Sequence, residues 1–285
     1  PRTPRLPRPP DGGTMGAMKR LLPMLLLATV VACKSNPHTG RGQLLIYSEE
    51  TMNKLGEEAY AEMTGPEAKV NVSSDPRLTA PLQRVGNAIA EAAEKPEYAW
   101  EFKLIDDKET VNAWCLPGGK IAFYTGIYPI LRDEAGMAIV MGHEVMHAIL
   151  QHGNERMSQG LAAQVVMAGA AVGLKDNQYR GEIIGALGAG AAVGVLLPYS
   201  RKHESEADKL GLFLAAKAGY DPEAAIGVWE RMAEMSEGKR PPEFLSTHPD
   251  PLNRIEAMRE WMPEAKRIYD QAPVKRANRP LPVVK

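Results

Sequence analysis

The chain has 285 residues, and its 34 lysines and arginines nearly balance its 35 aspartates and glutamates, for a formal net charge of −1. This near-neutral composition, without a basic stripe on any predicted element, argues against a nucleic-acid-binding protein. Only two cysteines are present, so a hydrophobic core rather than a disulfide framework must stabilise the fold. A chain of this length can bury such a core in one domain of ordinary size.

The first 32 residues are predicted to lie outside the folded domain. Residues 1–14 are rich in proline and arginine, a composition that favours disorder. A short positive region then precedes an apolar run from Leu21 to Val31, which has the length of a signal peptide and is too short to cross a bilayer. The small residue before Cys33 makes this segment similar to a bacterial lipoprotein signal, which predicts lipidation of Cys33. An ordinary signal peptide or an uncleaved anchor is the alternative.

Residues 33–47 are predicted to form a linker, residues 48–271 the folded domain, and residues 272–285 a disordered tail. The tail is short, basic and rich in proline, so we expect a solvated chain end; weak attraction to a membrane surface is the alternative. Lys34 follows the predicted lipidation site and, by resemblance to enterobacterial sorting rules, favours the outer over the inner membrane. The predicted location is the bacterial periplasm, with the chain held by an N-terminal lipid anchor.

The folded domain is predicted to open with two amphipathic helices. Apolar residues recur at helical spacing from Glu49 to Met63, and Gly65 ends this segment. Asp75 is placed to cap a second helix, which runs to near Pro96. Both helices are expected to serve as scaffold.

Between Tyr98 and Tyr124 the periodicity changes from helical to alternating, which indicates strands. Three strands, near residues 100–105, 111–115 and 120–124, predict a small antiparallel sheet. The last strand leads almost directly into the next helix, so we expect an edge beside that helix, with free backbone groups that an extended peptide can pair with. The residues expected to bind substrate in this way are Gly119, Lys120, Ile121, Ala122 and Phe123. A purely structural hairpin is equally compatible with these residues.

His143, Glu144 and His147 form an H-E-x-x-H motif in a segment with apolar residues at helical spacing. A helix turns by ~100° per residue, so His143 and His147 share one face and can offer two imidazole nitrogens to one ion. In this motif the histidines bind zinc and the glutamate accepts a proton from water. A chance match is the alternative. It is less favoured because the flanking residues predict a buried helix, where unpaired polar groups destabilise the fold.

The motif helix is expected to end near Gly153. His152 lies five residues after His147 and faces elsewhere, so a role at the helix terminus is favoured over a role as ligand. Gly160 to Leu197 then contains two segments rich in glycine, alanine and valine, each shorter than the ~20 residues that a membrane crossing needs. They are predicted to be closely packed helices; a hairpin that dips into a membrane is the alternative.

A helix from Ser200 to Gly219 is predicted to provide the third ligand. Glu204 and Asp208 are four residues apart and share one face. Glu206 is the competing candidate for the ligand, but it points away from the face of Asp208, so it is excluded if Glu204 binds. A carboxylate from Glu204 completes a His-His-Glu set and leaves a fourth position open, which is the pattern of catalytic rather than structural zinc sites. Asp208 is then placed to accept a proton from the outer nitrogen of a ligand histidine. One Zn²⁺ per chain is predicted.

Together these motifs resemble the gluzincin metallopeptidases of the CAAX prenyl protease and HtpX-like family. The resemblance rests on the H-E-x-x-H motif, on E-x-x-x-D at Glu204, and on the segment from Asn112 to Gly126. It is strongest for the soluble periplasmic branch that includes the beta-barrel assembly-enhancing protease, although the helical repeat domain of that branch is expected to be absent. The resemblance implies an α+β, mostly helical, zincin-like metalloprotease core, and it implies Glu204 as the third zinc ligand.

The family also carries a His-Pro segment near its end, which here matches the residues around His248. By this resemblance His248 is a catalytic candidate, either as a removable fourth zinc ligand or as a donor to the oxyanion. A turn residue fixed by two prolines is the alternative. Arg254, on the helix that follows, is a candidate clamp for the same region, and Tyr199 and Arg201 are weaker candidates for oxyanion contact.

The resulting prediction is a zinc-dependent endopeptidase of the bacterial cell envelope. Glu144 is expected to act as the general base towards zinc-activated water and then to protonate the leaving amine. By family analogy, the substrates are unfolded or misassembled envelope proteins. The alternative is an envelope lipoprotein that binds client proteins in a chaperone-like manner, with a structural or latent zinc site.

Overall fold

The computed structural model describes residues 33–173, 200–236, 243–248 and 251–284. The predicted leader and signal segment, residues 1–32, and residues 174–199 of the small-residue stretch lie outside the described part of the chain. Two compact units are present, Pro1–Ile46 and Tyr47–Lys285. Within the described residues, every helix falls short of the length or the hydropathy that crossing a bilayer demands.

The described part of the first unit is a small hairpin. Strand β1 (Cys33–Ser35) pairs antiparallel with β2 (Gly42–Leu44). Gly40, in the connecting turn, has a φ of 68°, a conformation that glycine adopts at little cost. The predicted linker at residues 33–47 therefore contains regular structure.

The second unit begins with the two amphipathic helices that the sequence predicts. Helix α2 is Glu49–Thr64 and helix α3 is Pro76–Ala93. Ser48 and Asp75 are their N-caps, and each side chain accepts a hydrogen bond from a backbone N–H of the first turn. One face of α3 is buried, as its apolar spacing predicts.

Three strands form the sheet of the second unit: β3 (Glu101–Ile105), β4 (Ala113–Leu116) and β5 (Lys120–Tyr124). Their order is β3-β5-β4, with β3 parallel and β4 antiparallel to β5. The sheet is therefore mixed, and β5 is its central strand rather than its edge. The edges are β3 and β4, because β5 is paired on both sides.

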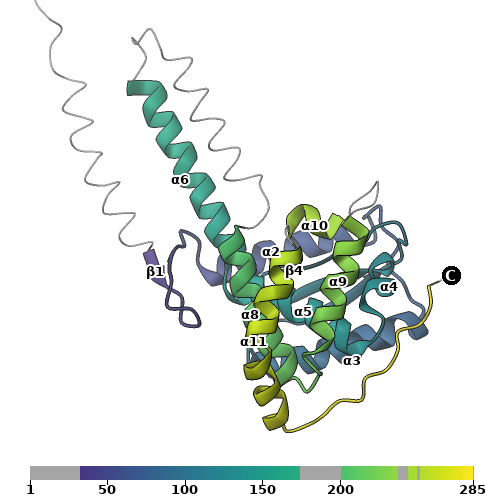
Figure 1. Ribbon diagram of the computed structural model, residues 1–285. Helices are drawn as coiled ribbons and strands as arrows, with labels where there is room; N and C mark the ends of the chain where they lie inside the picture. The colour runs from purple at the N-terminus through teal and green to yellow at the C-terminus, as the bar shows by residue number, and fades with distance from the viewer. Residues whose placement is uncertain (1–32, 174–199, 237–242, 249–250, 285) are drawn as a thin grey trace, which may run out of the picture. The chain divides into compact units, whose positions relative to one another are not determined.

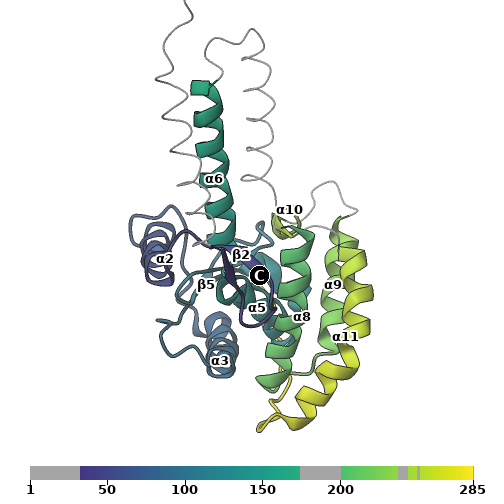
Figure 2. The same cartoon turned by 90° about the vertical axis from the view of Figure 1, so that its left-hand side faces the viewer.

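Helix α5 (Glu134–Ile149) carries the H-E-x-x-H motif, and all of its residues are buried. A short 3₁₀ helix, η1 (Thr125–Ile127), and α4 (Tyr128–Leu131) connect it to β5. In Figure 2, α5 lies between α3 and α8 (Arg201–Lys217), and it packs against both. The prediction of a buried motif helix is confirmed.

The backbones of α5 and α8 come close together at two glycines. A Cβ atom on Gly142 would lie 2.6 Å from the carbonyl oxygen of Gly211, and a Cβ atom on Gly211 would lie 2.7 Å from the backbone nitrogen of His143. Both distances are shorter than carbon contacts in folded proteins allow, so only glycine fits without moving a helix. This contact sets the position of α8 against the motif.

The remaining described helices are α6 (His152–Gly173), α9 (Ala224–Ser236), α10 (Glu243–Thr247) and α11 (Pro251–Gln271). Helix α11 packs along both α8 and α9, as Figures 1 and 2 show. The fold is α+β and mostly helical, which confirms the predicted class.

The C-terminal segment differs from its prediction as a disordered tail. It runs as an extended chain along the second unit, where the N–H of Leu281 donates to the carbonyl of Arg132 and the N–H of Arg276 donates to that of Gly219. Leu281 is buried. Backbone hydrogen bonds and one apolar anchor therefore order a segment whose composition alone favours disorder.

Candidate metal centre

Two histidines of α5 form the base of the site. His143 and His147 are one helical turn apart, and their Nε2 atoms lie 3.1 Å from each other. Both side chains are buried. Burial, and for His143 also the nearby Arg254 charge, lowers the pKa of His143 to about 4 and the pKa of His147 well below its usual value. Both imidazoles are therefore neutral at physiological pH, which is the form that binds a metal.

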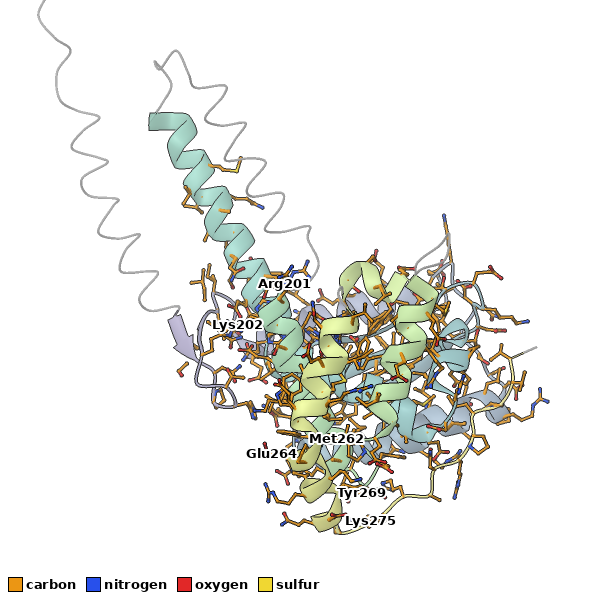
Figure 3. The ribbon with its side chains drawn as sticks, viewed as in Figure 1. Arg201, Lys202, Met262, Glu264, Tyr269 and Lys275 are labelled. Carbon is orange, nitrogen blue, oxygen red and sulfur yellow. The ribbon has the colours of Figure 1, made fainter. Side chains whose placement is uncertain are left out.

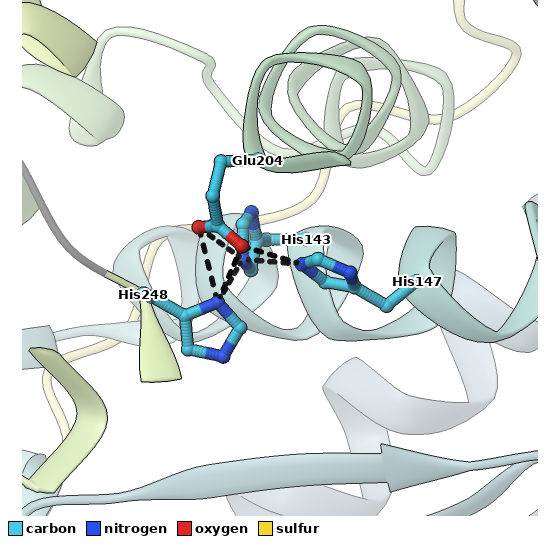
Figure 4. A group of neighbouring side chains, drawn as sticks. All are labelled: His143, His147, Glu204 and His248. Carbon is cyan, nitrogen blue, oxygen red and sulfur yellow. Dashed lines mark hydrogen bonds and ion pairs between the residues drawn. The ribbon is translucent and has the colours of Figure 1, made fainter. Parts of the chain in front are cut away.

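A carboxylate and a third imidazole complete the group. Glu204 lies in the first turn of α8, with Oε1 3.4 Å from His147 Nε2 and Oε2 3.7 Å from His143 Nε2. His248 follows α10, and its Nδ1 lies 3.0 Å from Glu204 Oε1 and 3.1 Å from His143 Nε2. Figure 4 shows the four side chains converging from three segments of the chain.

The donor set fits zinc. Ligand atoms of His143, His147, Glu204 and His248 all lie within 4.8 Å of one another, and all four residues are buried. Neutral imidazoles and a carboxylate are the nitrogen and oxygen donors that Zn²⁺ prefers. Burial raises the pKa of Glu204, but hydrogen bonds from His147 and His248 lower it by a larger amount. The net pKa is therefore below its usual value, and the carboxylate is ionised. The structure therefore brings the three predicted ligands together, and His248 joins them.

One carboxylate oxygen of Glu144, Oε1, lies beside the cluster without a hydrogen-bond partner among the described residues. This atom is buried, and His248 Nε2 is 3.4 Å away. Burial raises the pKa of Glu144 to about 7, against the lowering effect of His248. A carboxyl group that changes protonation near neutral pH and has a vacant oxygen is suited to proton transfer.

Asp208 and Arg254 support the cluster from α8 and α11. Asp208 Oδ1 lies 2.9 Å from His143 Nδ1, the outer nitrogen of that ring, as predicted from the spacing. Arg254 donates to both oxygens of Asp208, at 2.6 and 2.7 Å, and lies 3.1 Å from Glu204 Oε2. Its guanidinium carbon is 3.6 Å from the ring centre of Trp229. The candidate clamp at Arg254 is therefore a buried cation between two carboxylates.

His147 has an outer contact that the sequence analysis missed. Its Nδ1 lies 3.0 Å from Nδ1 of His152, and His152 Nε2 lies 3.1 Å from Glu206 Oε2. The prediction that His152 faces elsewhere assumed one continuous helix. Instead, Gln151 has a φ of 56°, which separates α5 from α6 and turns His152 back towards the motif. Glu206 is outside the metal cluster, as predicted, but it reaches the site through His152.

The two weaker oxyanion candidates remain predictions. Arg201 is exposed at the first residue of α8 and is labelled in Figure 3. Tyr199 lies outside the described residues, as do Pro249 and Asp250 of the His-Pro segment.

The edge beside the motif helix belongs to β4, not to β5. The N–H of Tyr124 donates to the carbonyl of Asn112, so in this antiparallel pair the backbone groups of Ala113 and Cys115 point away from β5. The N–H of Cys115 reaches the Glu144 carboxylate, where it lowers the pKa of that group. The prediction that the substrate-binding edge lies at β5 is therefore wrong, because β5 is the central strand. The residues predicted to form this edge are Gly119, Lys120, Ile121, Ala122 and Phe123.

Comparison with known proteins identifies the relatives of this arrangement. The family model described as peptidase family M48 matches residues 76–262. The mitochondrial metalloendopeptidase OMA1 of Schizosaccharomyces pombe is 34% identical over 232 residues, which are 81% of this chain and 66% of the relative. Its human counterpart is 30% identical over 260 residues, or 82% of this chain and 47% of the relative.

Bacterial proteins are also among the relatives. The beta-barrel assembly-enhancing protease of Escherichia coli is 26% identical over 224 residues, which are 76% of this chain and 44% of the relative. The expected likeness to that branch is therefore present, but the identity to the fission-yeast enzyme is higher. The chain spans about half to two thirds of the length of these relatives.

Proposed function

Because the chain belongs to peptidase family M48, we propose that it is a zinc-dependent endopeptidase with Glu144 as its general base. The observation that carries this proposal is the convergence of His143, His147 and Glu204 beside the unpaired oxygen of Glu144. Such a set provides the three protein ligands of a catalytic zinc site. Neither a buried core nor a surface ion pair requires this arrangement.

The residues of the chain divide the work of hydrolysis. His143, His147 and Glu204 would hold a zinc ion, which would lower the pKa of a bound water to about 7 and polarise a carbonyl group. Glu144 Oε1 accepts the proton of the attacking water and later delivers it to the leaving amine. Asp208 holds His143 in the tautomer that leaves Nε2 free. Arg254 keeps Asp208 ionised and also pairs with Glu204.

The substrate backbone is positioned by the free edge of β4. The outward carbonyl groups of Ala113 and Cys115 can accept hydrogen bonds from an extended peptide, whereas the N–H of Ala113 already donates to Asn112 Oδ1. A peptide held in this way passes next to Glu144, because the N–H of Cys115 reaches that carboxylate. Pairing with an edge strand reads the peptide backbone and not its sequence, which suits a protease for unfolded chains. Unfolded or misassembled envelope proteins are the substrates we propose.

The envelope location also belongs to this proposal. It is supported by the apolar segment that precedes Cys33 and by the resemblance of that segment to a lipoprotein signal. Incorporation of a labelled fatty acid into the parent but not into Cys33→Ser is the expected result. Equal labelling of both proteins contradicts lipidation at Cys33.

The proposed activity is tested with Glu144→Gln, which keeps the size of the side chain and removes the base. The parent should cleave unfolded casein, while the variant should bind an equal amount of zinc and cleave at least 100-fold more slowly, in keeping with the ~10²–10⁴-fold contribution of general-base catalysis. Cleavage by the variant at the parental rate rules out Glu144 as the base. Zinc content measured on both proteins separates loss of the base from loss of the metal.

A second candidate function rests on His248. Its Nδ1 lies within 3.1 Å of both His143 and Glu204, so four protein ligands are available to one ion. Four ligands are the pattern of closed, structural zinc sites, which fits a client-binding lipoprotein with a latent site. Casein cleavage that a chelator abolishes supports the protease. A zinc-loaded parent that is inert, with a His248→Ala variant that is equally inert, supports the client-binding protein.

A further inference from the structure

A cavity of about 310 Å³ lies next to the metal centre. It is bounded by α2, the end of β4, the end of α5 and the start of α6, and His147 and Cys115 are part of its lining. Its wall is mainly apolar, formed by Met52, Tyr98, Leu116, Pro117, Ala148 and Met157. None of the steps proposed for hydrolysis uses this space.

We propose that this cavity binds a large apolar side chain of the substrate, and that it gives the protease its sequence preference. This inference rests on the proposed function. The occupant follows from continuity, because Cys115 and Leu116 belong both to the β4 edge and to the cavity wall. A peptide paired with that edge passes the cavity, and side chains on one face of a strand follow each other at every second residue.

The size and polarity of the cavity decide which side chains fit. Protein cavities of roughly 150 Å³ are known to hold a benzene ring, so this cavity has room for a phenyl or a branched aliphatic group. A carboxylate or an ammonium group placed here loses its hydration against an apolar wall and is disfavoured. Glu49 and Arg156 also line the cavity and carry opposite charges, so the cavity has no net attraction for a charged side chain.

A buried acceptor in the cavity lining also indicates a ligand. Asn53, on α2, has a side-chain oxygen that is buried and makes no hydrogen bond among the described residues. An unsatisfied buried acceptor of this kind destabilises the free protein. A bound peptide carries backbone N–H groups that can donate to it, whereas an apolar molecule such as a lipid chain cannot.

The main variant is Gly153→Phe, because Gly153 lines the cavity and a Cβ atom added there meets no other atom within 4 Å. Gly153→Ala is the matched control, and Met157→Glu is a second variant at a residue that is 43% exposed and lines the cavity. The substrates are fluorogenic peptides that carry phenylalanine, leucine, alanine or aspartate at each position near the cleaved bond in turn.

At one position, the parent and Gly153→Ala should cleave the phenylalanine and leucine peptides with a kcat/KM at least tenfold above the aspartate peptide, the scale at which apolar pockets discriminate. Gly153→Phe and Met157→Glu should reduce that preference at least tenfold while they keep the parental zinc content. A preference that is unchanged in both variants overturns the proposal, as does the absence of any preference in the parent.

Binding separates this inference from the proposed function. Fluorescence anisotropy with zinc-loaded Glu144→Gln, alone and combined with Gly153→Phe, measures peptide affinity without cleavage. If the parent cleaves no peptide, the proposed function fails, and a tenfold weaker binding of the phenylalanine peptide on addition of Gly153→Phe still supports the cavity. Equal affinity in the two proteins overturns it. A crystal structure in which a lipid chain or a segment of the same protein fills the cavity overturns it as well.

Discussion

Replacing Asp208 by asparagine tests whether the buried charges behind the metal ligands act as a unit. Asp208 is 2% exposed and bonds both Arg254 and His143, at 2.6 to 2.9 Å. Burial raises the pKa of Asp208, but Arg254 and His143 lower it by a larger amount, so the net pKa is below its usual value. Asp208 is therefore a carboxylate at neutral pH. Asparagine keeps the shape, loses the charge, and turns an N–H₂ group towards one of the two donors.

The expected cost follows from these contacts. Removing one partner of a buried ion pair costs about 3–5 kcal/mol, and Glu204, which stays 3.1 Å from Arg254, should hold the loss near the lower limit. A loss of about 3 kcal/mol lowers the Tm of a chain of this size by roughly 6–12 °C. Zinc affinity should also fall by about 10–100-fold, because His143 loses the acceptor that orients its ring.

Urea unfolding of the chelator-treated protein measures the stability, and competition with a chromogenic chelator measures the zinc affinity. Asp75→Asn is the matched control, since Asp75 makes a similar two-oxygen contact with Arg77, but on the surface, where water screens it. Asparagine also caps a helix about as well as aspartate, so the control should change little. If Asp208→Asn and Asp75→Asn lose the same free energy of unfolding, the buried ion pair stabilises the fold no more than the surface pair does, and the reasoning is refuted.

Three further predictions concern the base, the helix contact and the metal. In the metal-free protein, Glu144 ionises with a pKa of about 7 when folded, against its ordinary pKa of 4.5 when unfolded. The protonated side chain therefore stabilises the fold fully below pH 4.5, and this contribution is lost as the pH rises above 7. Glu144→Gln should therefore match the parent at pH 4.5 and be roughly 3 kcal/mol more stable at pH 8, at ~1.4 kcal/mol per unit; a constant difference across that range in urea titrations contradicts the raised pKa. Gly211→Ala places a Cβ atom 2.7 Å from the nitrogen of His143, which should cost about 1–3 kcal/mol in urea unfolding, while Gly153→Ala, in open space, should be nearly neutral. Zinc at ~1,000 times its Kd should stabilise the parent by about 4 kcal/mol in thermal unfolding, and Glu204→Gln should lose most of that gain; an equal gain in both proteins excludes Glu204 as a ligand.

The parts of the site that depend on helix geometry are readable from the sequence. His143 and His147 share a face because of their spacing, and the same rule pairs Glu204 with Asp208 and sets Glu206 aside. The buried character of α5 also follows from its apolar flanks. These inferences hold because the α-helix has one fixed geometry, so the relative direction of two side chains follows from their separation alone.

The errors arise where the chain leaves that geometry. Alternation marks residues 120–124 as extended, but it carries no information on which strand is central, and the parallel pairing with β3 places β5 in the middle. His152 returns to the site because Gln151, between α5 and α6, adopts a left-handed conformation. A glutamine in the sequence does not predict such a conformation. Leu281 is ordered by a backbone partner more than a hundred residues away, and composition does not report such pairings.

Helix α8 explains why these separate residues form one site. It provides the ligand Glu204, the carboxylate Asp208 that orients one histidine, and Glu206, which reaches the other through His152. A rotation of α8 by one residue, ~100°, would move all three away together. The Gly142–Gly211 contact opposes that rotation, because it would put a residue with a Cβ atom in the place of Gly211, where a Cβ atom lies only 2.7 Å from the nitrogen of His143. The arrangement of metal ligands and their supporting carboxylates is therefore fixed by one contact between helix backbones, at residues that bind no metal themselves.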